Sequence, residues 1–299
     1  MSHPLRGSIG WRDWLSLARP QQWVKNGFVL APLLFSGRVR DPEAIGLAVL
    51  AFVAFCLSAS AVYAVNDVMD HVSDRAHPTK RRRPVAAGRI SVLTALGVGA
   101  MLGVLGVTLA VFIHRMLAVV LLAYLGLNLI YSLRLKHVVI LDVFAIAVFF
   151  LFRLLGGSVA IAVKPSIWLI LCGGLLALYL GFAKRRHELL LLGDESIDHR
   201  SVLSEYSTVF LDQMSVVLLS VTVVTYIMYT VSAEKVAEVG SHALVFSTAF
   251  VLYGVFRYLY LVHQRQGGSP TETLFTDRAL LLDVILWALY CGWVIYRPV

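Results

Sequence analysis

Long, uninterrupted apolar segments are the feature that most constrains how this chain can fold. Its apolar residues lie in blocks of span length rather than in amphipathic stripes, and only 15% of its 299 residues are charged. About 18 or more consecutive apolar residues can cross a bilayer as a helix, and a helix satisfies its own backbone hydrogen bonds inside lipid. The sequence therefore predicts an all-α integral membrane protein with a single membrane domain over residues 1–299, in which residues 1–18 form an interfacial segment.

The hydropathy pattern predicts nine membrane spans. The first is the weakest prediction, because Lys25 and Asn26 lie within it. The loops between consecutive spans are too short to hold a separate soluble domain. The predicted spans are residues 21–37, 43–65, 91–113, 115–133, 138–162, 166–183, 209–232, 242–263 and 279–296.

Basic residues are distributed unevenly between the two sets of loops. Sixteen Lys and Arg residues fall on the side of the N-terminus and six on the other side. Because cytoplasmic loops are enriched in Lys and Arg, we expect a cytoplasmic N-terminus and, after nine spans, a C-terminus outside. The net charge is +8, and the basic residues flank the spans rather than forming a soluble basic patch. We therefore expect the lipid bilayer and an anionic substrate as partners, and no nucleic acid.

An acidic motif follows the second predicted span. Asp67, Asp70 and Asp74 are spaced three and four residues apart, directly after Asn66. If the segment stays helical, the three carboxylates share an arc of roughly 60°. Like charges on one helical face repel one another, whereas Mg²⁺ prefers such oxygen ligands and fills its other positions with water and phosphate. The motif favours a metal and phosphate site over a solvated helix end.

A basic run, Lys80–Arg83, comes shortly after these carboxylates. Its four cations could bind a polyanionic substrate. The same run also fits a cytoplasmic loop whose charge only fixes the topology, and this alternative is the stronger one for the run taken alone.

Polar residues also cluster around the end of the fourth span and the start of the fifth. Tyr131 and Lys136 precede Asp142, which enters an apolar helix, where a carboxylate is costly and usually faces a polar cavity. Arg153 lies eleven residues further on and shares the face of Asp142. A buried Asp–Arg relay and a lipid-phosphate site both fit this pattern, while Lys136 could simply mark topology.

A third cluster closes the sixth span. Lys184 is four residues and Arg185 three residues from Glu188, so part of the cluster could be paired along the helix. Three cations, including Arg186, face one anion. The excess positive charge suits a phosphate group.

The motif NDVMDHVSD at 66–74, with the downstream RRRPVAAGRIS, resembles the first aspartate-rich motif of the UbiA superfamily of intramembrane prenyltransferases. The resemblance implies nine transmembrane helices around a central cavity, with the active site at the cytoplasmic face. It extends in order over nearly the whole chain, through residues 19–26, 77–81, 135–137, 153 with 156–157, 183–185, 205–207 and 277–278.

One departure points to a particular branch of that superfamily. Aromatic prenyltransferases carry a second aspartate-rich motif after the fourth span, where this chain offers only Asp142. The branch it resembles transfers a 5-phosphoribosyl group from 5-phosphoribosyl 1-pyrophosphate to a polyprenyl (decaprenyl-type) monophosphate and releases pyrophosphate. This resemblance implies an Mg²⁺-dependent enzyme, with Mn²⁺ as a substitute, in the bacterial inner membrane, where its product would supply cell-wall arabinan synthesis. A homo-oligomer is compatible with the pattern.

The resemblance also implies roles for the polar clusters. Asp67, Asp70 and Asp74 are the expected catalytic and metal-binding residues. The expected substrate-binding residues, most of them contacts to the donor phosphates, are Lys25, Asn66, Lys80, Tyr131, Lys136, Asp142, Arg153, Lys184 and Arg185.

Two other functions remain as alternatives. An aromatic prenyltransferase of the same fold would use a polyprenyl diphosphate and a quinone precursor, and it would share the first aspartate motif. A transporter of an anionic substrate would suit the intramembrane Asp142 and Arg153. The absence of an evident inverted repeat and the acidic triple at the membrane face argue against transport.

Overall fold

The computed structural model describes residues 10–76, 78, 80–192, 201–264, 273 and 276–296. Every regular element in these ranges is a helix, as predicted. Residues 1–9 of the expected interfacial segment, and His77 and Thr79 of the matched motif, lie outside the described residues. In the first half of the chain the helices are α1 (Trp11–Ala18), η1 (Pro20–Leu30), α2 (Ala31–Phe35), α3 (Pro42–Met69), α4 (His71–Ala76), η2 (Lys80–Arg82), α5 (Val92–Ile113) and α6 (Arg115–Leu133).

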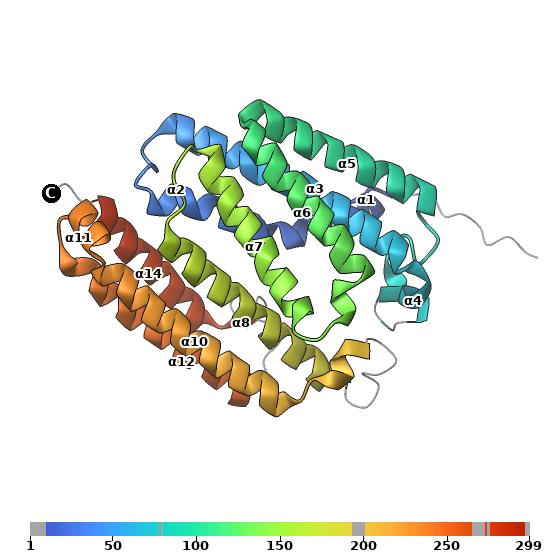
Figure 1. The fold of residues 1–299 in the computed structure, drawn as a ribbon. Coiled ribbons are helices and arrows are strands. Elements are labelled where there is room, and N and C mark those ends of the chain that lie inside the picture. The colour runs from blue at the N-terminus through green and yellow to red at the C-terminus, as the bar shows by residue number, and fades with distance from the viewer. Residues whose placement is uncertain are drawn as a thin grey trace, which may run out of the picture. The chain divides into compact units, whose positions relative to one another are not determined.

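The second half continues the all-helical pattern (Figure 1). Short 3₁₀ helices separate several of the long α-helices. The elements are η3 (Leu135–His137), α7 (Leu141–Ala160), α8 (Ile167–Leu192), η5 (Ser201–Glu205), α10 (Thr208–Val231), α11 (Ala233–Val239), η6 (His242–Ser247), α12 (Thr248–Gln264) and α14 (Arg278–Tyr296).

Eight helical segments of the described chain are long and apolar enough to cross a membrane. They correspond to the second through ninth predicted spans, with η6 and α12 together forming the segment His242–Gln264. The first predicted span, 21–37, differs from the prediction, because it forms the 3₁₀ helix η1 followed by the short α2. Pro32 explains part of this difference, since it has no N–H to donate to the Phe28 carbonyl. That carbonyl instead accepts from the N–H of Ala31, three residues on.

The chain forms two compact units that alternate along the sequence. Unit 1 contains Met1–Leu33, Arg38–Arg134 and Phe152–Lys164, and unit 2 contains Leu34–Gly37, Leu135–Leu151 and Pro165–Val299. The helix α7 begins in unit 2 and ends in unit 1, so the two units share one continuous helix.

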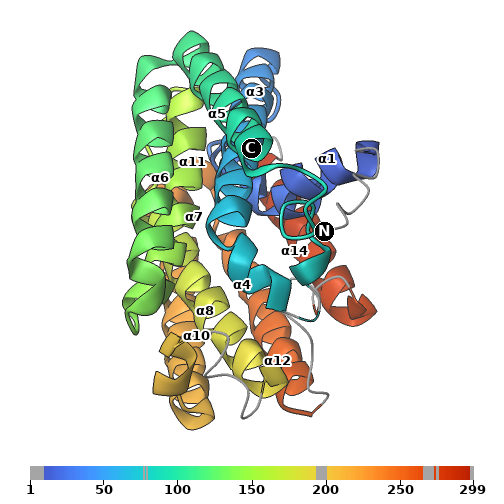
Figure 2. The same cartoon turned by 90° about the vertical axis from the view of Figure 1, so that its right-hand side faces the viewer.

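Unit 1 is organised around α3. This helix packs along α5 and also contacts α1, η1 and α6, and Figures 1 and 2 show α5 lying beside it. Small residues permit this close packing: a Cβ on Gly106 of α5 would lie 2.5 Å from Ser58 Oγ and 2.9 Å from the Ala54 carbonyl oxygen. The glycine therefore lets α5 approach the backbone of the helix that carries the acidic motif.

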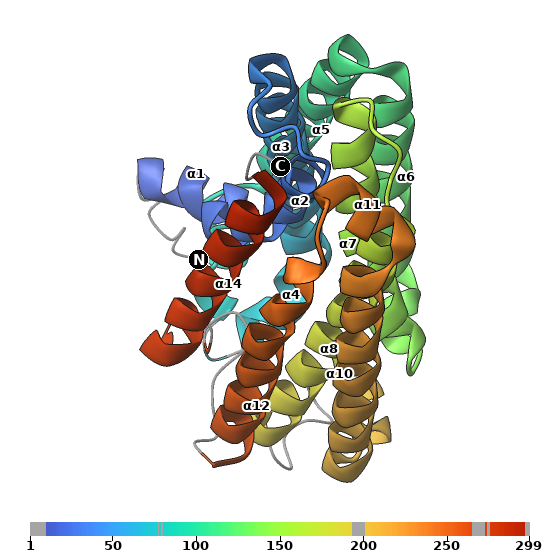
Figure 3. The same cartoon turned by 90° about the vertical axis from the view of Figure 1, so that its left-hand side faces the viewer.

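Unit 2 is organised around α10. This helix packs against α8, α12 and η6, while α12 contacts α14 (Figure 3). A buried aromatic cluster that includes Tyr226 and Tyr229 joins these helices. On α8, Gly181 allows close approach of α7, since a Cβ there would lie 2.6 Å from Val143 Cγ1. That contact brings the start of α7, with Asp142, against the part of α8 that carries Arg185.

Candidate active site

The acidic motif lies where α3 ends. The helix carries Asn66 and Asp67 in its last turn and ends at Met69, and α4 begins at His71. Between them Asp70 has φ −95° and ψ 0°, outside the helical region. The condition for three carboxylates on one helical arc, a segment that stays helical, is therefore not met. The interruption is local, because the N–H of Asp70 still donates to the Asn66 carbonyl at 2.9 Å.

Two arginines converge on Asp67, which is only 1% exposed. Arg19 donates directly to its Oδ1, and Nη1 of Arg83 lies 3.4 Å from the same atom. The same Arg83 Nη1 donates to Asp74 Oδ2 at 2.6 Å. Two buried carboxylates thus share two guanidinium groups, so their charges balance, as buried charges require.

Backbone conformation places Arg19 at this cluster. Arg19 follows the last residue of α1 with φ +51°, in the left-handed region, and its N–H donates to the Leu15 carbonyl at 2.9 Å. A non-glycine residue in this region costs on the order of 1–3 kcal/mol, and such strain concentrates at functional sites. The guanidinium also lies 5.0 Å from the centre of the Tyr63 ring, a cation–π contact on α3.

The donor set partly fits a divalent cation. Asp67 Oδ2 is buried and has no hydrogen-bond partner within the described chain, so one hard oxygen is still available to a ligand. The same chain regions contain no group of three His, Cys, Asp or Glu side chains in a metal-binding arrangement. Asp67 and Asp74 already lie on either side of one cation, Arg83. Asp67 and Asp74 supply the carboxylate oxygens of this cluster, and their role as metal ligands stays a prediction.

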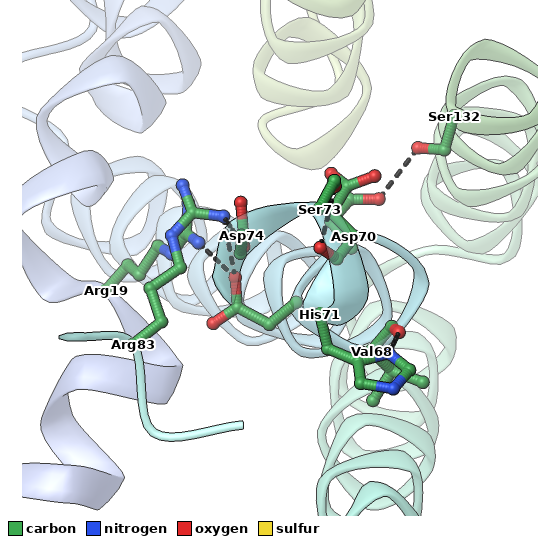
Figure 4. Close-up of polar contacts among 10 residues, drawn as sticks. Arg19, Val68, Asp70, His71, Ser73, Asp74, Arg83 and Ser132 are labelled. Atoms are coloured by element: carbon green, nitrogen blue, oxygen red, sulfur yellow. Dashed lines mark hydrogen bonds and ion pairs between the residues drawn. The ribbon is translucent and has the colours of Figure 1, made fainter. Parts of the chain in front are cut away.

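The other predicted residues of the motif region take different positions. Asn66 accepts a hydrogen bond at 2.7 Å from Ser132 of α6. Figure 4 shows Asp70 on the side of Ser132, whereas Asp74 lies on the side of the arginines. Three further predicted residues lie elsewhere in unit 1: half-buried Lys25 on η1, half-buried Tyr131 on α6 and exposed Lys80 on η2.

Arg153 forms a buried cluster within unit 1. It is 4% exposed and donates from Nε to Asn26 Oδ1 at 2.7 Å and from Nη2 to the Tyr124 hydroxyl at 3.2 Å. Its guanidinium also stacks on the Tyr124 ring, with 5.1 Å to the ring centre. Asn26, which made the first span a weak prediction, is completely buried here. Of the two possibilities that the sequence left open for Arg153, the relay with Asp142 is not formed, because Asp142 pairs with Arg185.

Asp142 instead belongs to a second buried cluster, within unit 2. Arg185 and Asp142 are both 0% exposed, and Arg185 Nε donates to Asp142 Oδ2 at 2.6 Å. The hydroxyl of Tyr206 donates to Asp142 Oδ1 at 2.8 Å. Arg185 also pairs with Glu188, and Lys184 Nζ lies 3.7 Å from that carboxylate. The predicted pairing along this helix is confirmed, and Lys136 lies half-buried on η3 of the same unit.

Sequence reasoning assigned no individual role to Arg19, Arg83 or Tyr206, which belong to these clusters. Each lies in a segment that the sequence singles out, in the matched residues 19–26 and 205–207 or in the basic run. Their partners are remote, since Arg19 is 48 residues from Asp67 and Tyr206 is 64 from Asp142. Local spacing cannot show such pairs, because it reports only neighbours within one helix.

Comparison with known proteins shows the family to which this chain belongs. The model of the UbiA prenyltransferase family matches residues 28–282. Decaprenyl-phosphate phosphoribosyltransferase of Mycobacterium tuberculosis (strain CDC 1551 / Oshkosh) is 35% identical over 278 residues, which cover 92% of this chain and 91% of the relative. The protein of the same name from Mycolicibacterium smegmatis is 31% identical over 293 residues, covering 94% and 92%.

A solved structure agrees with this relationship. The structure of a UbiA homolog from Archaeoglobus fulgidus, bound to GPP and Mg²⁺, matches this fold with a TM-score of 0.73. The match covers 95% of this chain and all of that chain, at 18% identity. With eight apolar helices of membrane-spanning length among its described residues, the chain is an integral multi-pass membrane protein and a transferase, and it belongs to the UbiA prenyltransferase family.

Proposed function

We propose that this protein transfers a 5-phosphoribosyl group from 5-phosphoribosyl 1-pyrophosphate to a polyprenyl monophosphate of the decaprenyl type. The observation that carries the proposal is the set of relatives named decaprenyl-phosphate phosphoribosyltransferase, which match over more than nine-tenths of the chain at 31–35% identity. We further propose that the reaction takes place at the cytoplasmic face of a bacterial inner membrane and yields a precursor for cell-wall arabinan.

The proposed reaction does not require a general base from the protein. An oxygen of the lipid phosphate attacks the anomeric carbon of the ribose, a new C–O bond forms, and pyrophosphate leaves with the electrons of the old bond. The attacking phosphate is already anionic, so no side chain must remove a proton. The protein must instead hold two polyanions together and stabilise charge on the leaving group, which depends on positioning and preorganised cations.

The arginine–aspartate cluster of unit 1 suits this task. The side chains of Arg19 and Arg83 keep 21% and 25% of their surface exposed, although both contact Asp67. Guanidinium groups bind phosphate oxygens in a bidentate manner. We assign these two arginines, together with the predicted Lys25 and Lys80, to the phosphates of the donor.

Asp67 and Asp74 would hold a divalent cation, with Asp67 Oδ2 as the available ligand atom. Mg²⁺ bound there would neutralise negative charge on the pyrophosphate. The Mg²⁺ bound to the Archaeoglobus fulgidus homolog supports this choice for the family fold. Asp70 remains a predicted third carboxylate. Asn66, hydrogen-bonded to Ser132, would orient the end of α3.

A direct assay tests the function. Purified protein in lipid is incubated with radiolabelled 5-phosphoribosyl 1-pyrophosphate and polyprenyl monophosphate, and the product is extracted into organic solvent. We expect a labelled lipid that forms with Mg²⁺ or Mn²⁺ and is absent in excess chelator. A parallel reaction with a prenyl diphosphate and an aromatic acceptor is the comparison. A prenylated aromatic product, together with no labelled lipid, would replace this proposal with the aromatic prenyltransferase.

A further inference from the structure

A left-handed turn in unit 2 precedes the buried Asp142. Ile140 has φ +69°, a conformation that is unfavourable for a β-branched residue. The turn links η3, which carries Lys136, to the start of α7. Within it, the N–H of Leu141 donates a hydrogen bond to the carbonyl of Val139, two residues earlier, at 2.8 Å. Side-chain packing does not explain the positive φ of Ile140, because this residue is 41% exposed.

Tyr206 supplies what holds this turn. Its hydroxyl oxygen accepts a hydrogen bond at 2.6 Å from the N–H of Ile140, and its hydroxyl proton is donated to Asp142 Oδ1 at 2.8 Å. A single oxygen atom therefore connects the strained backbone to a carboxylate that Arg185 holds from its other side. An oxygen that both accepts and donates in this way fixes the orientation of both partners.

Burial and two neighbouring aromatic rings hold the Tyr206 side chain in place. Tyr206 is 5% exposed, its ring stacks on Phe210 at 6.1 Å between ring centres, and the edge of Phe182 approaches at 6.5 Å. Burial, with a further contribution from Asp142, raises the pKa of Tyr206 to about 12. The hydroxyl therefore keeps its proton, and its role as donor, at every pH where an enzyme of this kind would work.

We propose that Tyr206 is a positioning residue, which holds Ile140 in its left-handed conformation and so fixes the η3 segment that presents Lys136 to the substrate. The inference rests on the proposed function, because Lys136 matters only where a donor phosphate binds. It assigns Asp142 and Arg185, both predicted as substrate contacts, to the support of this turn. The proposal also gives a role to Tyr206 within the matched segment Glu205-Tyr206-Ser207.

The decisive variants are Tyr206→Phe and Ile140→Gly. Tyr206→Phe keeps the stacked ring but leaves the Ile140 N–H and Asp142 Oδ1 without their partner. We expect the KM for 5-phosphoribosyl 1-pyrophosphate to rise about tenfold, with kcat changed less than about twofold. Glycine adopts positive φ without strain, so Tyr206→Phe combined with Ile140→Gly should recover most of the lost affinity. A role limited to core packing predicts no such rescue.

A matched control is Tyr226→Phe. Tyr226 is another buried tyrosine of unit 2, and its hydroxyl is hydrogen-bonded to Ser247 and Trp287. This variant loses a buried hydroxyl of the same kind, but it touches neither Ile140 nor Asp142. We expect its KM for the donor to stay within about twofold of the wild-type value, because its bonds do not hold η3.

Amide hydrogen exchange provides a measurement independent of the reaction. In the substrate-free protein, Tyr206→Phe should speed exchange of the Ile140 amide, while Tyr226→Phe should not. Wild-type protein that makes no labelled lipid would refute the proposed function, whereas the exchange result would still decide the role of Tyr206. Unchanged exchange and unchanged KM in Tyr206→Phe would overturn the positioning role. So would a failure of both Tyr206→Phe and its Ile140→Gly double variant to fold.

Discussion

Asp67 is the residue on which the charges of the candidate active site converge. Asp67→Asn keeps the size of the side chain but removes the charge that balances Arg19 and Arg83. We expect product formation to fall by roughly 10²-fold or more, the usual effect of removing one electrostatic group from a preorganised site. Labelled-lipid formation by purified protein measures the loss.

Asp41→Asn is the matched control for Asp67→Asn. Asp41 also pairs with an arginine, Arg38, but it lies at the opposite end of α3, where it caps the first turn. We expect this variant to keep near wild-type activity and a nearly unchanged stability, because asparagine caps a helix about as well as aspartate. Activity of Asp67→Asn within threefold of Asp41→Asn would remove Asp67 from the site.

Arg153 gives a second prediction for a single residue. Its guanidinium donates to both Asn26 and Tyr124, and a lysine cannot reproduce this forked arrangement. We expect Arg153→Lys to insert normally and to lose about tenfold in kcat/KM, which corresponds to one hydrogen bond of a charged group.

Tyr124→Phe tests one contact of Arg153. This variant removes the hydrogen bond of 3.2 Å between Arg153 Nη2 and the Tyr124 hydroxyl, and it leaves the aromatic ring beneath the guanidinium. Its loss of activity should therefore be the smaller of the two. Equal activity of Arg153→Lys and wild-type protein would show that the guanidinium is not needed in this cluster.

The sequence predicted which residues are polar inside the membrane, but not how they pair. Asp67, Asp142 and Arg153 stood out because charge is costly in apolar spans. Their partners come from other helices, and hydropathy carries no information on contacts between helices. The shared helical face left an Asp142–Arg153 relay possible, and it does not form because Arg185 pairs with Asp142.

At the scale of secondary-structure elements, an ion pair connects α1 to the loop before α5. Arg89 Nε donates to Asp13 Oδ1 at 2.7 Å, and this hydrogen bond lowers the pKa of Asp13 below its usual 3.8. A carboxyl whose pKa is lower in the folded state stabilises that state above the unfolded pKa, and this contribution is lost as the pH falls through the folded pKa.

Wild-type protein should therefore be more stable than Asp13→Asn at pH 7, by an amount that stays constant down to about pH 5. The difference should shrink as the pH falls further, because both forms are then neutral at this position. Thermal unfolding in detergent at pH 7, 5, 4 and 3 measures it. A difference that does not change between pH 7 and pH 3 would contradict the ionic origin of this contact.

Close helix packing at Gly157 gives a second prediction for the elements. A Cβ on this α7 residue would lie 2.0 Å from the Val29 carbonyl oxygen of η1, and backbone cannot move aside easily. We expect Gly157→Ala to lower the stability by roughly 1–3 kcal/mol, as overpacking usually does. Gly126→Ala on α6 is the control, because nothing lies within 4 Å of its added Cβ. That variant should be neutral or more stable by up to about 1 kcal/mol.

Thermal unfolding midpoints of the two glycine variants measure this difference. Equal midpoints would show that η1 can shift away from α7 at no cost. The long helices themselves were predictable, because a span needs only length and apolarity. The break in the first span was not found, although Pro32 is visible in the sequence, because a hydropathy window does not register a missing N–H donor.

For the whole molecule, the single membrane domain over residues 1–299 stays a prediction, and the described chain forms two compact units. Hydropathy identifies the spans but not which of them pack together, since every span is apolar. The units alternate along the sequence, and α7 passes from one to the other. No loop composition could have revealed that division, because its boundary falls within a helix.

The orientation of the whole molecule in the membrane is the remaining prediction. Sixteen Lys and Arg residues lie on the expected cytoplasmic side and six on the other, a bias that places the N-terminus inside. Two exposed alanines report on the two sides: Ala87, in the loop between α4 and α5, and Ala237, in α11. Each is replaced by cysteine in a variant whose three native cysteines, Cys56, Cys172 and Cys291, have been changed to serine or alanine.

Intact cells are then treated with a maleimide that cannot cross the membrane. We expect Ala237→Cys to be labelled at once, and Ala87→Cys only after the cells are opened. The same loop as Ala87 carries Arg83, so its cytoplasmic location would place the arginine–aspartate cluster on the side where a soluble, phosphorylated donor is made. Labelling of Ala87→Cys in intact cells would invert the topology. The donor could not then reach this cluster from the cytoplasm, and the proposed reaction would fail whatever the chemistry of the residues.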